Sequence, residues 1–185
     1  MRPNCTALFV LACGGWFGGA TCEAREPFDL NDQALATFDF EGMALPTSTA
    51  QLTREFPAAR RDAERIDEEI GLECYEVDNL ANADRARFYF CDGKLYQFEV
   101  EYSLPRVEKL GGMAIVLQKL VDRWGPVDHA GESRWTWQRP TYKRRADFYA
   151  WPDKAQLTMT DMTWMPIVER RIKRQDAKER LNLGI

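Results

Sequence analysis

The segment Glu73 to Tyr102, ECYEVDNLANADRARFYFCDGKLYQFEVEY, limits the possible folds of this 185-residue chain more than any other segment. Apolar and polar residues alternate along it, which predicts antiparallel strands with one buried face. Tyr75 and Val77 share a face of the first strand, and Phe88 and Phe90 share that face of the second. A one-residue slip would bury charged side chains, so the pattern predicts a sheet that pairs apolar with apolar residues.

A hairpin centred on residues 82–83 satisfies this requirement, because it pairs Tyr75 with Phe90 on the apolar face. The same register places Cys74 opposite Cys91 on the other face. Cross-strand Cβ atoms lie about 4.5–5.5 Å apart, slightly farther than the roughly 3.5–4.5 Å of a disulfide. A small local shift closes the bond, so we predict a disulfide between Cys74 and Cys91. The alternative is a pair of free, partly buried thiols.

The next turn, CDGK, is predicted from the same pairing rule. An Asp-Gly pair usually forms a two-residue hairpin turn. Here that turn would place Phe88 opposite Gln97 and mix the two faces. A three-residue loop with a left-handed Gly93 pairs Phe88 with Tyr96 instead, so the sequence favours the loop.

Two helices are indicated by their ends and their apolar spacing. Ser48 and Gln51 form a capping-box pattern at the start of the first helix, and Pro57 ends it. The second helix has an apolar stripe and a glycine at its C-terminal end; these residues are Met113, Leu117, Leu120, Val121, Trp124 and Gly125.

A pattern of helix followed by strands occurs twice in the chain. Several matching residues lie 60 positions apart: Tyr75 and Trp135, Val77 and Trp137, Ala86 and Ala146, Phe88 and Phe148, Tyr89 and Tyr149, and Lys94 and Lys154. In the second copy, WPDK suits a two-residue turn that pairs Phe148 with Leu157 and Ala146 with Met159. Chance matching of apolar periodicity is the alternative explanation of this repeat.

These patterns predict an α+β fold made of two tandem units, each a helix and a three-stranded antiparallel sheet, that share one core. The units span about 46–102 and 106–162, within a single domain of residues 37–164. Residues 25–36 are polar and predict a flexible arm. Residues 165–185 predict a basic helix that begins at Pro166.

The N-terminus has the composition of a secretory signal. One charged residue, Arg2, precedes an apolar run, and no other charge occurs before Glu23. We therefore predict a signal peptide of residues 1–24 and export to the periplasm or the exterior. The alternative is a lipoprotein signal, because FVLAC places a small residue directly before Cys13, the possible site of lipidation.

Charge and motifs argue against several classes of function. The formal net charge is −4, which does not favour nucleic-acid binding. His129 is the only histidine, and no phosphate loop, zinc-protease helix or nucleophile-elbow motif occurs, so we expect no metal or cofactor. Carboxylates are plentiful, so a hydrolase that uses two carboxylates stays as a third hypothesis, and a solvated acidic surface is the simpler explanation.

Two surfaces are candidates for binding. Tyr89, Tyr149 and Trp151 point away from the predicted core, and Trp151 is expected opposite Arg134, where the two could form a cation–π pair. An open face of this kind would suit a protein partner, whereas the arm or a helix could instead cover it.

The C-terminal helix is the second candidate surface. It holds six basic residues between Arg170 and Arg180 and could lie on an anionic membrane. The alternative is a packed first turn followed by a solvated tail.

The segment GMALPTSTAQLTREFP, followed by strands, resembles the start of small bacterial envelope domains. These are the β-lactamase-inhibitor-protein-like group and the small lipoprotein of outer-membrane assembly. The resemblance covers about 20 residues and implies binding or assembly rather than catalysis. We therefore predict an exported, non-enzymatic binding or protein-interaction domain of the bacterial cell envelope. A lipid-anchored structural or assembly lipoprotein is the alternative.

Overall fold

The computed structural model describes residues 39–40, 43–45, 47–65, 67–80 and 83–183. In these ranges the chain forms an α+β fold with an eight-stranded antiparallel sheet and four α-helices. The predicted α+β class, the antiparallel sheet and the C-terminal helix are confirmed. The predicted signal peptide, Cys13 and the arm of residues 25–36 lie outside the described residues.

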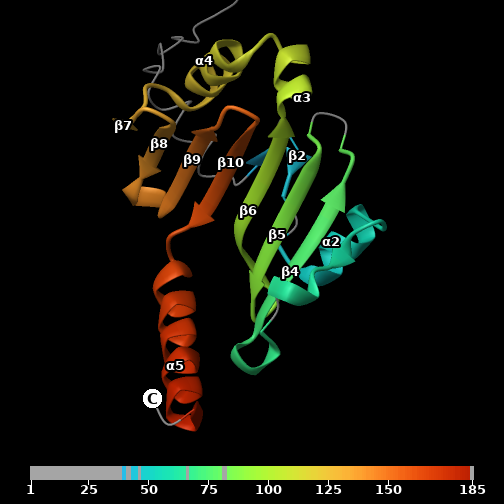
Figure 1. The fold of residues 1–185 in the computed structure, drawn as a ribbon, viewed down its shortest axis with the longest axis vertical. Helices are drawn as coiled ribbons and strands as arrows, with labels where there is room; N and C mark the ends of the chain where they lie inside the picture. The colour runs from blue at the N-terminus through green and yellow to red at the C-terminus, as the bar shows by residue number, and fades with distance from the viewer. Residues whose placement is uncertain (1–38, 41–42, 46, 66, 81–82, 184–185) are drawn as a thin grey trace, which may run out of the picture.

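The sheet contains two sets of three longer strands that meet at its centre, and a short strand lies at each edge (Figure 1). One set is β4 (Leu72–Asp78), β5 (Arg85–Cys91) and β6 (Lys94–Ser103). The other is β8 (Arg134–Arg139), β9 (Arg144–Ala150) and β10 (Lys154–Asp161). The strand order is β3-β4-β5-β6-β10-β9-β8-β7, so β6 and β10 join the two sets into one continuous sheet.

Short elements complete the described fold. The two-residue strands β3 (Arg60–Arg61) and β7 (His129–Ala130) form the edges of the large sheet. A separate pair is formed by β1 (Asp39–Phe40) and β2 (Met43–Ala44). Three 3₁₀ turns, η2 (Ala63–Arg65), η3 (Glu68–Ile70) and η4 (Pro140–Tyr142), lie in the connections.

The predicted faces of β4 and β5 are correct, but the predicted register is wrong by two residues. Tyr75 pairs with Phe88 rather than Phe90. A two-residue shift leaves every side chain on its predicted face, so alternation alone could not detect the error. In the observed register Arg85 contacts Asp78, with Nε 3.0 Å from Oδ1, and the neighbouring Arg87 pairs with Glu76 in the same way. The true register therefore places two pairs of opposite charges directly across the strands, where the predicted register places one.

The register shift removes the predicted disulfide. Cys74 lies opposite Tyr89, and Cys91 lies opposite Leu72, so the two cysteines are diagonal neighbours. Both are buried free thiols. Diagonal positions on paired strands are about 7–8 Å apart, which is beyond the Cα separation that a disulfide spans.

The turn between β5 and β6 also differs from the prediction. Asp92 and Gly93 form a two-residue turn, and both have the positive φ angles, 49° and 71°, that a type I′ turn requires. The extra residue lies within the strand, where a β-bulge at Tyr96 shifts the register. Phe88 then pairs with Phe98, so the bulge keeps the apolar faces together and a longer loop is unnecessary.

The second set of strands follows its predicted hairpin. Phe148 pairs with Leu157, and Ala146 pairs with Met159, as the two-residue turn in WPDK predicts. On the other side, Phe148 pairs with Trp135. This pair lies 60 residues after the pairing of Tyr75 with Phe88 in the first set.

Three helices bury one face of the sheet: α2 (Thr49–Glu55), α3 (Leu104–Lys109) and α4 (Met113–Trp124). Ser48 caps α2 as predicted, since its hydroxyl accepts a hydrogen bond from the Gln51 backbone N–H at 3.3 Å. The Gln51 side chain accepts from the Thr47 N–H rather than from the Ser48 N–H that a capping box predicts. Trp124 at the end of α4 packs against Trp137, with ring centroids 5.4 Å apart. The Trp137 indole nitrogen donates to the Gly125 carbonyl at 2.9 Å, which ties the predicted C-terminal cap of α4 to β8.

The fourth helix, α5 (Met165–Leu183), begins one residue before the predicted start. Its first turns cover part of the other sheet face, where Val168 is buried in a second apolar cluster; this cluster contains Leu72, Cys74, Tyr89, Cys91 and Tyr96. Farther along, Arg171 binds Asp92 and the Ile70 carbonyl. The rest of α5 extends past the end of the sheet (Figure 1).

Phe88 and Phe148 are core residues of the two sets of strands, with exposed fractions of 1% and 0%. We predict that Phe88→Ala or Phe148→Ala lowers the free energy of unfolding by about 3–5 kcal/mol. Tyr142→Ala is the matched control, because that ring is 43% exposed, and its cost should stay within about 0.5 kcal/mol. Denaturant titration of the three variants measures these values, and equal losses for Phe88→Ala and Tyr142→Ala would contradict the assignment of the core.

Candidate binding groove on the polar face of the sheet

The sheet face opposite the three helices is polar along β6, β10 and β9. In β10, Leu157 and Met159 face the core, so the alternating residues Gln156, Thr158 and Thr160 face the other side. Strand pairing lines these residues up with the outward residues of the neighbouring strands. One row across the sheet is Glu99, Thr158, Asp147 and Thr136.

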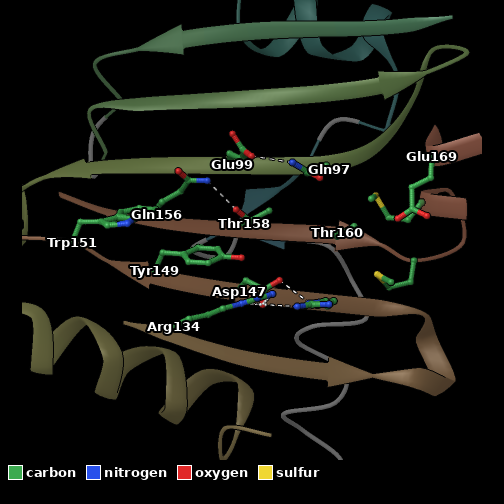
Figure 2. Close-up of a pocket in the computed structure, with 13 residues that line it drawn as sticks. Gln97, Glu99, Arg134, Asp147, Tyr149, Trp151, Gln156, Thr158, Thr160 and Glu169 are labelled. Atoms are coloured by element: carbon green, nitrogen blue, oxygen red, sulfur yellow. Dashed lines mark hydrogen bonds and ion pairs between the residues drawn. The ribbon is translucent and has the colours of Figure 1, made fainter. Parts of the chain in front are cut away.

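This polar surface forms a groove of about 520 Å³ (Figure 2). Trp151 and Tyr149 lie at one end, and Glu169 of α5 lies at the other. The groove is lined by Gln97, Glu99, Arg134, Arg145, Asp147, Tyr149, Trp151, Gln156, Thr158, Thr160, Met162, Met165 and Glu169.

Asp147 organises the charges on one side of the groove. Its Oδ1 accepts hydrogen bonds from Arg134 Nε at 3.0 Å and from the Thr136 hydroxyl at 2.6 Å, and its Oδ2 accepts one from Arg145 Nε at 2.7 Å. Burial opposes ionisation of this carboxyl, but the bonds from Arg145, Thr136 and Arg134 outweigh burial and hold the pKa of Asp147 below its ordinary value. Two guanidinium groups share one carboxylate, so this cluster has a net charge of about +1.

The aromatic end of the groove is a stack of four side chains. The rings of Tyr149 and Trp151 are parallel to within 10°, with centroids 5.5 Å apart. Arg134 lies over Tyr149 at 5.1 Å, and Lys154 lies over Trp151 at 5.5 Å. The predicted pairing of Arg134 with Trp151 is therefore wrong by two residues, because Arg134 lies opposite Tyr149. The structure nevertheless brings the predicted residues Arg134, Tyr149 and Trp151 together.

Tyr89, the fourth predicted surface residue, does not belong to the open groove. It points to the predicted face but is only 8% exposed, because it lies in the apolar cluster that α5 covers. Its hydroxyl donates to Glu99 Oε2 at 2.7 Å and accepts from Arg65 at 3.1 Å. Burial and the adjacent Glu99 carboxylate raise the pKa of Tyr89. The buried Tyr89 hydroxyl therefore fixes the position of the Glu99 carboxylate at the edge of the groove.

The two cysteines are structural rather than reactive. Burial raises the pKa of the Cys74 thiol to about 12, and burial also raises the pKa of Cys91. Neither thiol is in the thiolate form near neutral pH, so neither has the environment of a catalytic nucleophile.

The described residues contain no group of three or more His, Cys, Asp or Glu side chains placed to hold a metal ion. His129 lies exposed on the edge strand β7. In the part of the chain that the structure describes, no helix combines the length and apolar character needed to cross a membrane.

Comparison with known proteins yields no relative. No protein-family model, curated protein or solved structure matches the chain. The envelope-domain resemblance therefore has no support beyond the short segment described above.

Sequence reasoning missed most of the groove. Asp147, Arg145 and Thr158 were not recognised as site residues, although the alternation in RRADFYA and KAQLTMTD marks them as facing away from the core. Glu99 was also missed, because its place in the groove depends on the pairing of β6 with β10, which connects distant parts of the sequence.

The network around Asp147 predicts a pH-dependent stability. The folded-state pKa is depressed, so its stabilising effect is fully present above the ordinary value of 3.8 and is lost as pH falls through the folded value. We expect Asp147→Asn to cost about 1–3 kcal/mol at pH 7, and to cost progressively less as pH falls below 3.8 and through the lower folded-state pKa. Urea denaturation across this range tests the prediction, and a cost independent of pH would contradict it.

The burial of both cysteines predicts slow chemical modification. In the native chain, alkylation of Cys74 and Cys91 should require unfolding, whereas both should react rapidly in denaturant without added reductant. Peptide mapping by mass spectrometry separates them from the other three cysteines of the chain. A linked Cys74–Cys91 peptide, or rapid alkylation of the native protein, would show that this part of the structure is wrong.

Proposed function

We propose that this protein is an exported, non-enzymatic binding domain of the bacterial cell envelope that holds a protein partner in the groove. The observation that carries this proposal is the contrast between the two sheet faces. Three helices bury one face, whereas no described segment covers the 520 Å³ groove on the other.

The chemistry of the groove suits a polypeptide. Gln97, Gln156 and Thr158 provide amide and hydroxyl groups that can both donate and accept hydrogen bonds, as a peptide backbone requires. Trp151 is 38% exposed at the rim, with Arg134 on the adjacent Tyr149 ring, and tryptophan and arginine are enriched in protein interfaces. Both faces of the Tyr149 and Trp151 pair are occupied by cations, so a sugar ring has no free aromatic face to stack on.

The groove gives little support to the hydrolase hypothesis. A general acid near neutral pH needs a raised carboxyl pKa, whereas that of Asp147 is lowered. Glu99 accepts hydrogen bonds from Tyr89 and Gln97, which hold it in a structural network.

The same proposal includes a two-unit origin of the fold. The units span about 46–102 and 106–162, and α2 and α4 each contribute a helix to one of them. Support comes from strand pairings that recur 60 residues apart, such as Tyr75 with Phe88 and Trp135 with Phe148. The groove would then have formed where the two units meet, since β6 belongs to one unit and β10 to the other.

Export rests on the signal-like composition of residues 1–24. If the lipoprotein signal is used, the same binding domain is anchored through a lipid on Cys13 and acts as an assembly lipoprotein. Intact-mass measurement of the envelope fraction distinguishes a lipid-modified Cys13 from a chain cut after Ala24. An uncut chain recovered from the cytoplasm would contradict both forms of the proposal.

Site-specific crosslinking in the producing cell tests the groove directly. A photoreactive phenylalanine analogue at Trp151 should capture a partner, whereas the same analogue at Tyr142 is the matched control, because that aromatic residue is exposed outside the groove. Adding Gln156→Arg should fill the groove and abolish capture from position 151. Equal capture from positions 151 and 142, or capture that survives Gln156→Arg, would contradict the proposed site.

A further inference from the structure

The cations of α5 divide into two groups. Arg171 and Lys178 attach the helix to the body, through Asp92 and Glu69 respectively. The opposite helix face contains Arg170, Lys173, Arg174 and Arg180, all of which are exposed. None of these four forms an ion pair with any residue that the structure describes. We name these four residues the basic face.

Helix stability accounts for only part of the basic face. Glu169 lies four residues before Lys173, and Asp176 lies four before Arg180, but Arg170 and Arg174 have no acidic residue at such a spacing. Arg170 and Lys173 are three residues apart, and Arg170 and Arg174 are four apart, so these like charges are neighbours that repel one another. Cations stabilise a helix through its dipole only in the last turn, and only Arg180 lies there. The remaining three lie in the middle of the helix.

The basic face is also physically accessible. A 19-residue helix is about 28 Å long, and the second half of α5 extends beyond the sheet (Figure 1). The contacts of this half with the body run through η3, where Lys178 and Gln175 bind Glu69. Charges on the acidic body are screened over a Debye length of about 8 Å at physiological salt, so they weaken the field at the far end of α5 only partly.

We propose that the basic face of α5 binds the surface of an anionic membrane. The four cations extend over about 15 Å along one side of a helix, which matches a flat field of negative headgroups better than a single anion. A protein interface would need a desolvated anchor at its centre, and Pro166, Glu169 and Ala177, which lie beside these cations on the same side of the helix, provide no aromatic or large aliphatic group. This inference does not depend on a partner in the groove, because none of the four cations lines the groove.

Vesicle sedimentation with the full chain tests the proposal. The chain should bind vesicles of mixed phosphatidylglycerol and phosphatidylcholine, and binding should weaken as salt increases. Removing one cation should reduce the partition coefficient about fivefold, so Lys173→Gln/Arg174→Gln should reduce it about 25-fold. Pure phosphatidylcholine vesicles measure any contribution from the apolar N-terminal segment, which the variant leaves unchanged.

Lys109→Gln/Lys119→Gln is the matched control, because it removes the same charge from exposed positions of α3 and α4 at the other end of the molecule (Figure 1). It should change binding by less than about twofold, and circular dichroism should show that both variants remain folded. Equal effects of the two variants, or no preference for anionic vesicles, would overturn the proposal. Binding to polyglutamate without binding to anionic vesicles would also overturn it, since the basic face would then suit an acidic polypeptide.

Discussion

The pairing of β6 with β10 is the interaction on which the rest of the structure depends. Seven residue pairs, from Lys154 with Ser103 to Thr160 with Gln97, join the two sets of strands. Without this pairing, each set would expose an unpaired edge and leave half of the apolar core uncovered. The same contact aligns Glu99 with Thr158, so it also builds the floor of the groove.

A single bulge helps to determine how the polar face is divided. At Tyr96, β6 carries one extra residue, so Tyr96 and Gln97 both point to the face opposite the main core. Tyr96 joins the apolar cluster that α5 covers, whereas Gln97 lines the groove. The bulge therefore lies at the boundary between the part of the face that is buried and the part that stays open.

The remainder of this face is occupied by charge pairs across β3, β4 and β5. Arg87 contacts Glu76 at 3.1 Å, and Arg60 contacts Asp78. Arg60 is mostly exposed, so its pair contributes little stability, whereas the side chains of Arg87 and Glu76 are largely buried. Both pairs neutralise charges beside the groove. Around Asp147, in contrast, two arginines share one carboxylate, which leaves that cluster with a net charge of about +1.

Local patterns predicted the strands, most of their faces, the cap of α2 and the second hairpin, but they placed Tyr96 on the core face, where Phe98 pairs with Phe88 instead. They could not predict the register of β4 with β5, because pairings that differ by two residues keep Tyr75 and Val77 on the same face. The sequence also argued against the two-residue turn at Asp92 and Gly93, because without a bulge that turn mixes the two faces. The bulge at Tyr96 restores the faces, but no residue pattern in the sequence predicts it. Only part of the open surface was predicted. Alternation identified Tyr149 and Trp151, but it could not show that Tyr89 is buried, because that depends on the packing of the distant helix α5.

Residue-resolved hydrogen exchange tests most directly whether β6 and β10 unite the molecule. If they do, the slowest amides of β4–β6 and of β8–β10 should open with the same free energy, equal to that of global unfolding. All of them should shift together when Phe98→Ala weakens the centre of the sheet. If one set of strands opens at a clearly lower free energy while the other stays protected, the two sets are separate folding units. In that case the central pairing does not support the fold as described here.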